Sequence, residues 1–201
     1  MDFTTEDLKA LFAVFAARMQ AERDALCALD GVIGDADHGV AMEQGMSAAA
    51  VAARNADGTL QDIFNAAAKE FLNAVGASSG PLYATGLIRA GKAVGARTTM
   101  PRDDLRQVVV AIRDGIAQRG KAEPGQKTML DAWGPAAEVA RSGQNADAIM
   151  EAAQAGAEAT RNMVAALGRA ARLGDRAVGH RDPGAVSAAM LVSEICRAMR
   201  G

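Results

Sequence analysis

One apolar pattern with the period of an α-helix recurs along this chain and constrains its fold more than any other feature. Apolar residues at i, i+3, i+4, i+7 and i+11 fall on one face of a helix, so each occurrence predicts a helix with one buried side. The pattern occurs in the segments 8–19, 60–71, 105–116 and 188–199. No run alternates or concentrates β-branched residues as a strand does, which argues against Rossmann and P-loop architectures.

Weaker, alanine-rich helical patterns lie between these segments. They cover residues 40–53, 81–95, 128–142 and 146–168, and Asn145 is a plausible N-cap for the last of them. Only seven residues are aromatic, and abundant alanine favours closely packed helices. Short polar connections, such as 55–58 and 142–145, favour antiparallel neighbours. We therefore expect an all-α, eight-helix, antiparallel up-and-down bundle or barrel that forms a single domain over residues 1–201.

Composition narrows the class of partner and the compartment. A formal net charge of −2 carries no nucleic-acid or membrane signature. The longest uncharged stretch, 71–88, is interrupted by polar residues and a proline, so it is a poor membrane span. The acidic start, 1–7, lacks the features of a signal peptide. Cys27 and Cys196 lie in apolar helical patterns and read as small core residues of a reducing compartment. We expect a cytoplasmic protein.

Three aspartates crowd the connection that follows the first helical pattern. Asp35 and Asp37 lie in the run Gly-Asp-Ala-Asp-His-Gly (34–39), and Asp30 stands just upstream. Two unit charges about 4 Å apart repel by roughly 4 kcal/mol at an effective dielectric of 20, so such a cluster favours a hard cation. Magnesium usually keeps one or two protein carboxylates and completes its shell with water and phosphate, which points to a metal and nucleotide site. The alternative for Asp35 and Asp37 is an ordinary turn and N-cap.

Three further connections carry polar groups at helix starts. In 76–81, small residues and serines precede a proline, and free amides and hydroxyls there can hold a phosphate or simply cap the helix. The loop 120–129 superficially resembles a Walker A motif, but Gln126 stands where a glycine must precede Lys127, so we reject that interpretation. A fourth polar loop covers 179–185. Alternate connections of an antiparallel bundle share one end, so all four motifs are expected at one rim.

These segments resemble the nucleotide-binding L subunits of bacterial dihydroxyacetone kinases, the DhaL family. The matching residues follow the family order over nearly the whole chain: Asp30 with 34–39, then 76–83, 127–132 and 182–185. The resemblance implies an eight-helix barrel that binds ADP or ATP at one end. It further implies that three aspartates hold the phosphates through two Mg²⁺ ions.

The same resemblance implies an activity divided between proteins. The nucleotide-binding subunit transfers a phosphoryl group to dihydroxyacetone on a separate K subunit. In the phosphotransferase-type system, the retained ADP is recharged by a phosphohistidine donor protein, whereas ATP-dependent relatives exchange their nucleotide. The acceptor, which can also be another ketose such as erythrulose, the donor, the fate of ADP and the stoichiometry of the complex all stay open. A non-catalytic ADP-binding regulatory module is the alternative from another class.

Residue by residue, the resemblance assigns a metal site and a nucleotide site. The expected metal ligands are Asp30, Asp35 and Asp37. The expected nucleotide-binding residues are His38, Gly39, Val40, Ala41, Ser78, Ser79, Gly80, Gly120, Thr128, Met129, Arg176, Asp182, Pro183 and Gly184. No nucleophile is expected, because phosphoryl transfer requires mainly positioning and charge neutralisation.

The chain departs from the family pattern at four positions. They are Ala41, Ala84, Gln126 and Arg172, where the family commonly has asparagine, glycine, aspartate and an aromatic residue. These changes leave the aspartate loop intact, but they put the standard donor and acceptor in doubt and motivate the regulatory alternative.

Several residues have ordinary structural interpretations when the family match is set aside. Lys127 and Arg176 then read as surface charges, and His180 as a structural histidine. Tyr83 and Trp133 read as packing residues near the rim rather than as a platform for adenine.

Overall fold

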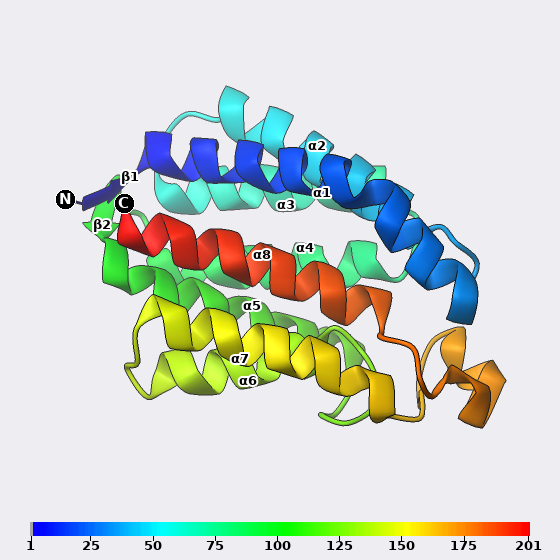
Figure 1. The fold of residues 1–201 in the computed structure, drawn as a ribbon. Helices are drawn as coiled ribbons and strands as arrows, with labels where there is room; N and C mark the ends of the chain where they lie inside the picture. Colours follow the sequence, from blue (N-terminus) through cyan, green and yellow to red (C-terminus); the bar gives the residue numbers. More distant parts are fainter. Residues whose placement is uncertain (1) are drawn as a thin grey trace.

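Eight α-helices run up and down along one common direction in residues 2–201, the part of the chain that this computed structural model describes (Figure 1). They are α1 (Thr5–Ile33), α2 (His38–Asn55), α3 (Leu60–Ala74), α4 (Ser79–Val94), α5 (Leu105–Gly120), α6 (Leu130–Arg141), α7 (Ala146–Ala159) and α8 (Pro183–Arg200). Each helix packs on the next, and α8 packs back on α1, which closes the ring. The expected all-α, eight-helix architecture is therefore confirmed. Over the residues described, every helix is too short or too polar to cross a bilayer.

The apolar stripes form the core of this ring. All five stripe residues of the first helix are buried, and so are those of α3, α5 and α8. At the centre, the ring of Phe12 lies edge-on to Phe15 and Phe64, with centroids 5.8 and 5.6 Å apart. Burial of such side chains contributes roughly 1.5–3 kcal/mol each, so the stripes fix which face of each helix points inward.

Polar side chains cap the N-termini of several helices. The Thr4 and Thr59 hydroxyls accept from the amides of Asp7 and Asp62, whose carboxylates bond back to the threonine amides. These are capping boxes. The Asn145 side chain accepts from the amide of Ala148 at 2.9 Å, which confirms the cap expected for α7.

Two short strands are an addition to the expected helices. β1 (Asp2–Thr4) pairs antiparallel with β2 (Thr99–Pro101), and a 3-10 turn (Arg102–Asp104) leads from β2 into α5. Phe3 lies opposite Met100, and both side chains are buried. Three residues are too few to show an alternating pattern, so this ribbon could not be predicted from the sequence. It lies beside the C-terminus, at the left end of the bundle in Figure 1.

The helix expected over 146–168 ends early, and this is a correction. α7 stops at Ala159, and 3-10 turns at Thr160–Asn162 and Ala170–Ala177 carry the chain to α8. The Thr160 hydroxyl bonds back to the carbonyl of Ala157 at 2.6 Å, and Gly168 adopts a left-handed φ of 70°. The carbonyl oxygens of Thr160 and Met163, which a longer helix would use, lie instead within hydrogen-bond distance of the buried Lys127 ammonium. We call residues 160–182 the crossover segment.

Candidate functional site

A cavity of ≈ 780 Å³ opens at the end of the bundle opposite the strands. Residues from the α1–α2, α3–α4, α5–α6 and α7–α8 connections all line it, so the four motifs do share one rim. Its size is that of a small-molecule site. The lining includes these expected residues: Asp30, Asp35, Asp37, His38, Ala41, Ser78, Ser79, Gly120, Thr128, Met129, Asp182, Pro183 and Gly184.

Four expected nucleotide-binding residues lie outside the cavity lining. A Cβ on Gly39 would lie 2.0 Å from the carbonyl oxygen of Arg23, so this glycine lets α2 begin against α1. A Cβ on Gly80 would likewise lie 2.4 Å from the carbonyl oxygen of Val75. Val40 is half-buried beside Gly39. Arg176 is exposed on the crossover segment, where the structure does not bring it to the cavity.

The three aspartates converge. Asp30 lies on the last turn of α1, not in the loop, and Asp35 and Asp37 lie in the following connection. One carboxylate oxygen from each lies within 4.8 Å of the others. Asp30 is only 8% exposed, and its Oδ2 accepts from the amides of Asp37 at 3.0 Å and His38 at 3.2 Å. Those amides fix the orientation of the buried carboxylate, so the set suits a hard cation.

A positive side chain already lies among these carboxylates. The Arg169 guanidinium, from the crossover segment, forms an ion pair with Asp35. The pair offsets part of the negative charge of the cluster. Sequence reasoning did not single out Arg169, because nothing near it in the chain marks a partner 134 positions away.

His38 joins the start of α2 to α8. Its Nε2 lies 2.9 Å from the hydroxyl oxygen of Ser187, which donates to the carbonyl of Gly184 at 3.1 Å. The serine oxygen therefore accepts from Nε2–H, and Nδ1 is left as an acceptor. Burial lowers the pKa of His38, and the charge of Asp30 opposes that shift. The imidazole is thus neutral near pH 7, and Ser187 was missed because it lies in the middle of an apolar pattern.

The start of α4 presents hydrogen-bonding groups to the cavity. The Ser78 side chain, at the N-cap, accepts no capping bond from the described first turn, and Ser79 is 5% exposed. An ordinary capping role does not account for Ser78. The Gly80 amide already donates to the carbonyl of Ala77 and Pro81 has no N–H, so the two serine hydroxyls and the helix N-terminus are what favour an anion here.

The α5–α6 loop is held by a buried carboxylate. Asp131 is 4% exposed, and it accepts from the amide of Thr128 at 2.7 Å and from that of Gly125 at 2.5 Å. Thr-x-x-Asp before an apolar run is the signature of a capping box, so this signal was present in the sequence. The bonds fix Thr128 and Met129 at the cavity wall.

Lys127 is not a surface charge, and this interpretation was wrong. Its side chain is 2% exposed, and backbone carbonyls surround its ammonium group. The interior carbonyls replace the water that a surface lysine would bind. Burial lowers the pKa of Lys127, and the nearby Asp182 opposes the shift.

Asp182 is the N-cap of α8. Its Oδ2 accepts from the amide of Ala185 at 2.7 Å. Burial raises the pKa of Asp182 to about 7; the Ala185 amide and Lys127 lower it, whereas the charges of Asp131 and Asp30 raise it. Burial and the neighbouring carboxylates therefore favour the protonated form of Asp182 more than they would for an exposed aspartate.

Other expectations concern residues around the rim. Tyr83 and Trp133 are each 1% exposed, so their interpretation as packing residues is confirmed. Burial raises the pKa of Tyr83 to about 12. His180 is exposed. Cys196 is buried as expected, whereas Cys27 is only half-buried, where α1 meets the start of α2.

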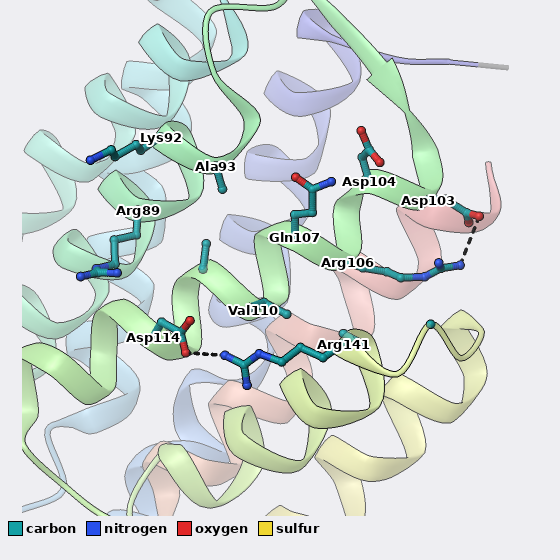
Figure 2. Close-up of a pocket in the computed structure, with 13 residues that line it drawn as sticks. Arg89, Lys92, Ala93, Asp103, Asp104, Arg106, Gln107, Val110, Asp114 and Arg141 are labelled. Atoms are coloured by element: carbon teal, nitrogen blue, oxygen red, sulfur yellow. Dashed lines mark hydrogen bonds and ion pairs between the residues drawn. The ribbon is translucent and has the colours of Figure 1, made fainter.

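A second cavity, of ≈ 830 Å³, lies on the outer side of α4 and α5 (Figure 2). Its charges are largely matched in pairs: Asp114 with Arg141 at 2.7 Å, and Asp103 with Arg106 at 3.1 Å. None of the expected site residues lines it. The rim cavity is therefore the candidate site.

The chain is similar to known proteins over most of its length. The model of the DAK2 domain matches residues 32–197. The ADP-binding subunit DhaL of a PEP-dependent dihydroxyacetone kinase from Escherichia coli is 39% identical over 188 residues, covering 89% of this chain and 90% of that protein. A subunit of the same description from Listeria innocua is 38% identical, covering 88% of each chain.

A solved structure shares the fold. The dihydroxyacetone kinase from C. freundii, in complex with AMP-PNP and Mg²⁺, matches with a TM-score of 0.73 and 27% identity. The match covers 94% of this chain, which spans about a third (33%) of the longer protein.

Proposed function

The chain belongs to the DAK2 domain family, and on that premise we propose that it is the ADP- or ATP-binding subunit of a dihydroxyacetone-type kinase. One observation carries the proposal: three carboxylates gather in a cavity to which all four rim connections contribute. That arrangement supports a site for divalent cations close to the start of α4.

In this proposal, Asp30, Asp35 and Asp37 hold two Mg²⁺ ions. When bound, magnesium supplies positive charge that neutralises the phosphate oxygens during transfer. The Ser78 and Ser79 hydroxyls, at the positive end of the α4 dipole, bind phosphate oxygens.

The remaining lining residues enclose the nucleotide. His38 and Ala41 lie along the phosphates, and Gly120, Thr128 and Met129 form one wall. Asp182, Pro183 and Gly184 form the wall at the start of α8. For Gly39, Val40, Gly80 and Arg176, we propose supporting roles through the backbone or the edge of the site, because they lie outside the lining.

The acceptor is dihydroxyacetone or a related small ketose on a separate K subunit. A phosphohistidine protein of the phosphotransferase system recharges the bound ADP. The relatives from E. coli and L. innocua are subunits of PEP-dependent kinases, which supports this donor over free ATP.

The binding part of the proposal is tested by nucleotide-dependent stability. Mg-ADP should stabilise the fold by roughly 2.7 kcal/mol at about a hundredfold excess over its dissociation constant. Asp35→Asn should remove most of that shift in a thermal denaturation measurement. Asp57→Asn, at an exposed position in the α2–α3 connection at the other end of the bundle, is the matched control and should keep it. A wild-type melting curve that is the same with and without Mg-ADP would refute nucleotide binding.

The transfer part is tested by reconstitution. The chain is mixed with its K subunit and dihydroxyacetone, and then either with ATP or with a phosphohistidine donor. Phosphorylation that occurs only with the phosphohistidine donor supports the proposal. Turnover with ATP alone would show that ATP, and not a phosphohistidine protein, is the phosphoryl donor. Binding of Mg-ADP without turnover from either donor would favour a regulatory module.

A further inference from the structure

One lysine is buried among backbone carbonyls beneath the rim. Of the five lysines in the chain, Lys127 alone has a buried side chain among the residues described. Its Nζ lies 2.8 Å from the carbonyl oxygen of Thr160 and 3.2 Å from that of Met163. The carbonyl oxygens of Ala177 and His180 lie at 2.8 and 2.6 Å. An ammonium has three N–H donors, which are here shared among four acceptors.

All four carbonyls belong to the crossover segment. This segment contains only 3-10 turns between α7 and α8, so no α-helical bond satisfies these oxygens, and only the Thr160 carbonyl also accepts a backbone bond, from the amide of Met163 at 3.1 Å. Buried carbonyls need partners, and four that point to one spot also repel each other unless a cation lies among them. The Lys127 ammonium, from the α5–α6 loop, therefore supplies the positive charge that these carbonyls of the crossover segment need.

The backbone at Lys127 supports a specific role. Its φ of 60° is left-handed, which is unfavourable for a residue with a side chain. This conformation persists while the neighbouring Thr128 amide bonds to Asp131. The loop thus holds Thr128 toward the cavity and the Lys127 ammonium among the crossover carbonyls.

The crossover segment also forms part of the cavity. Leu167, Gly168, Arg169 and Asp182 all line it, and Arg169 pairs with Asp35. Whatever fixes the segment therefore fixes one wall of the candidate site.

We propose that Lys127 is a positioning residue whose buried ammonium fastens the crossover segment to the α5–α6 loop and thereby sets the affinity for nucleotide. The effect on affinity rests on the proposed function, whereas the fastening does not. Positive charge is the essential property, because the partners are carbonyl dipoles.

The fastening is tested without nucleotide. Lys127→Met keeps the length of the side chain and removes its charge, and Lys121→Met changes an exposed lysine of the same loop. Amide hydrogen exchange over residues 160–182 should become about tenfold faster or more in Lys127→Met and stay unchanged in Lys121→Met. Ile63→Val, a core variant in α3, controls for a general loss of stability. Equal exchange in Lys127→Met and wild type would overturn the proposal.

The requirement for charge is tested by rescue. Lys127→Ala leaves the four carbonyls without their cation, so ammonium or potassium chloride should slow exchange in the crossover segment toward the wild-type rate. Tetramethylammonium chloride at the same concentration, too large for the site, should not. Equal effects of the three salts would show that the lysine acts through packing alone and would overturn the proposal.

The link to the site is tested by titration with Mg-ADP. The dissociation constant should rise by about tenfold or more in Lys127→Met and return toward the wild-type value when ammonium is added to Lys127→Ala. Faster exchange with an unchanged dissociation constant would overturn the positioning role. Absence of Mg-ADP binding to the wild type would refute the proposed function and leave the fastening intact.

A wild-type measurement covers the case in which the variants do not fold. Acetylation of the native protein with an amine-reactive ester, followed by peptide mass spectrometry, should modify Lys127 at least about tenfold more slowly than Lys69, Lys92 and Lys121, which are exposed. Modification of all four at similar rates would overturn the proposal.

Discussion

Asp182 makes the stability of the metal-free protein depend on pH. Its folded-state pKa of about 7 lies above the ordinary value of 3.8. Between these values the folded state keeps a proton that the unfolded state has lost. The stabilisation from this proton is therefore complete below the unfolded-state pKa of 3.8. It decreases as the pH rises and is lost once the pH passes the folded-state pKa of about 7. Asp182→Asn keeps an N-cap acceptor and cannot titrate, so we expect this fall to disappear, a change of up to about 1.4 kcal/mol per pH unit.

Urea denaturation in the presence of a chelator, at a series of pH values, measures this difference. Asp62→Asn is a useful control: the Thr59 hydroxyl lowers the pKa of the Asp62 carboxyl, so it does not titrate in the same window. Parallel stability curves for Asp182→Asn and wild type would contradict the prediction.

Gly39 is required by the close approach of α2 to α1. The Cβ of an alanine there would lie 2.0 Å from the backbone oxygen of Arg23, so the helices must move apart. We expect Gly39→Ala to lower the free energy of unfolding by about 1–3 kcal/mol. Gly134 in α6 has no atom within 4 Å of a built Cβ, and Gly134→Ala should stabilise by roughly 0.5–1 kcal/mol. Chemical denaturation of both variants measures their free energies of unfolding. An equally large decrease in Gly134→Ala and Gly39→Ala would contradict the prediction.

The contacts that could be predicted from the sequence are those between residues that lie near one another in the chain. Asp30, Asp35 and Asp37 lie within eight positions, so their convergence could be anticipated from the loop alone. Lys127 and Arg169 could not be interpreted in this way, because their partners come from other connections. Their contacts depend on how the crossover segment folds, and no local pattern specifies that.

At the scale of the element, the caps set where helices begin. The Thr59 hydroxyl accepts from the amide of Asp62 at 3.3 Å, at the end of the bundle away from the rim. Thr59→Ala should lower the free energy of unfolding by about 1 kcal/mol, and Thr59→Ser should retain most of the cap. Because the cap is far from the cavity, affinity for Mg-ADP should not change. Denaturation and nucleotide titration check the two parts, and weaker binding by Thr59→Ala would contradict the second.

Helix identity was predictable, whereas one helix end was not. An apolar stripe with a 3.6-residue period has one physical solution, and every stripe became a buried helix face. Residues 160–168 contain no proline and were expected to continue the helix, yet they leave it at Thr160. Thr160 also accepts from the amide of Asp182 at 2.9 Å, so a long-range contact overrides the local preference for helix.

At the scale of the molecule, antiparallel alternation placed the site before any contact was known. Alternate connections of such a bundle must meet at one end, and they do meet around the rim cavity. The size and lining of that cavity were not predictable, because they depend on the irregular crossover segment rather than on helix periodicity.

The closed ring also makes a prediction about unfolding. α8 packs on both α7 and α1, so neither terminal helix is free to leave without exposing the shared core. The single tryptophan, Trp133, is buried in α6, which makes its fluorescence a local probe, whereas far-ultraviolet circular dichroism reports all helices. If residues 1–201 form a single domain, both signals should give the same urea midpoint, and Mg-ADP should move both midpoints upward together. A fluorescence transition that precedes the loss of helix, or that alone responds to Mg-ADP, would show that the α5–α8 side unfolds separately from the rest of the ring.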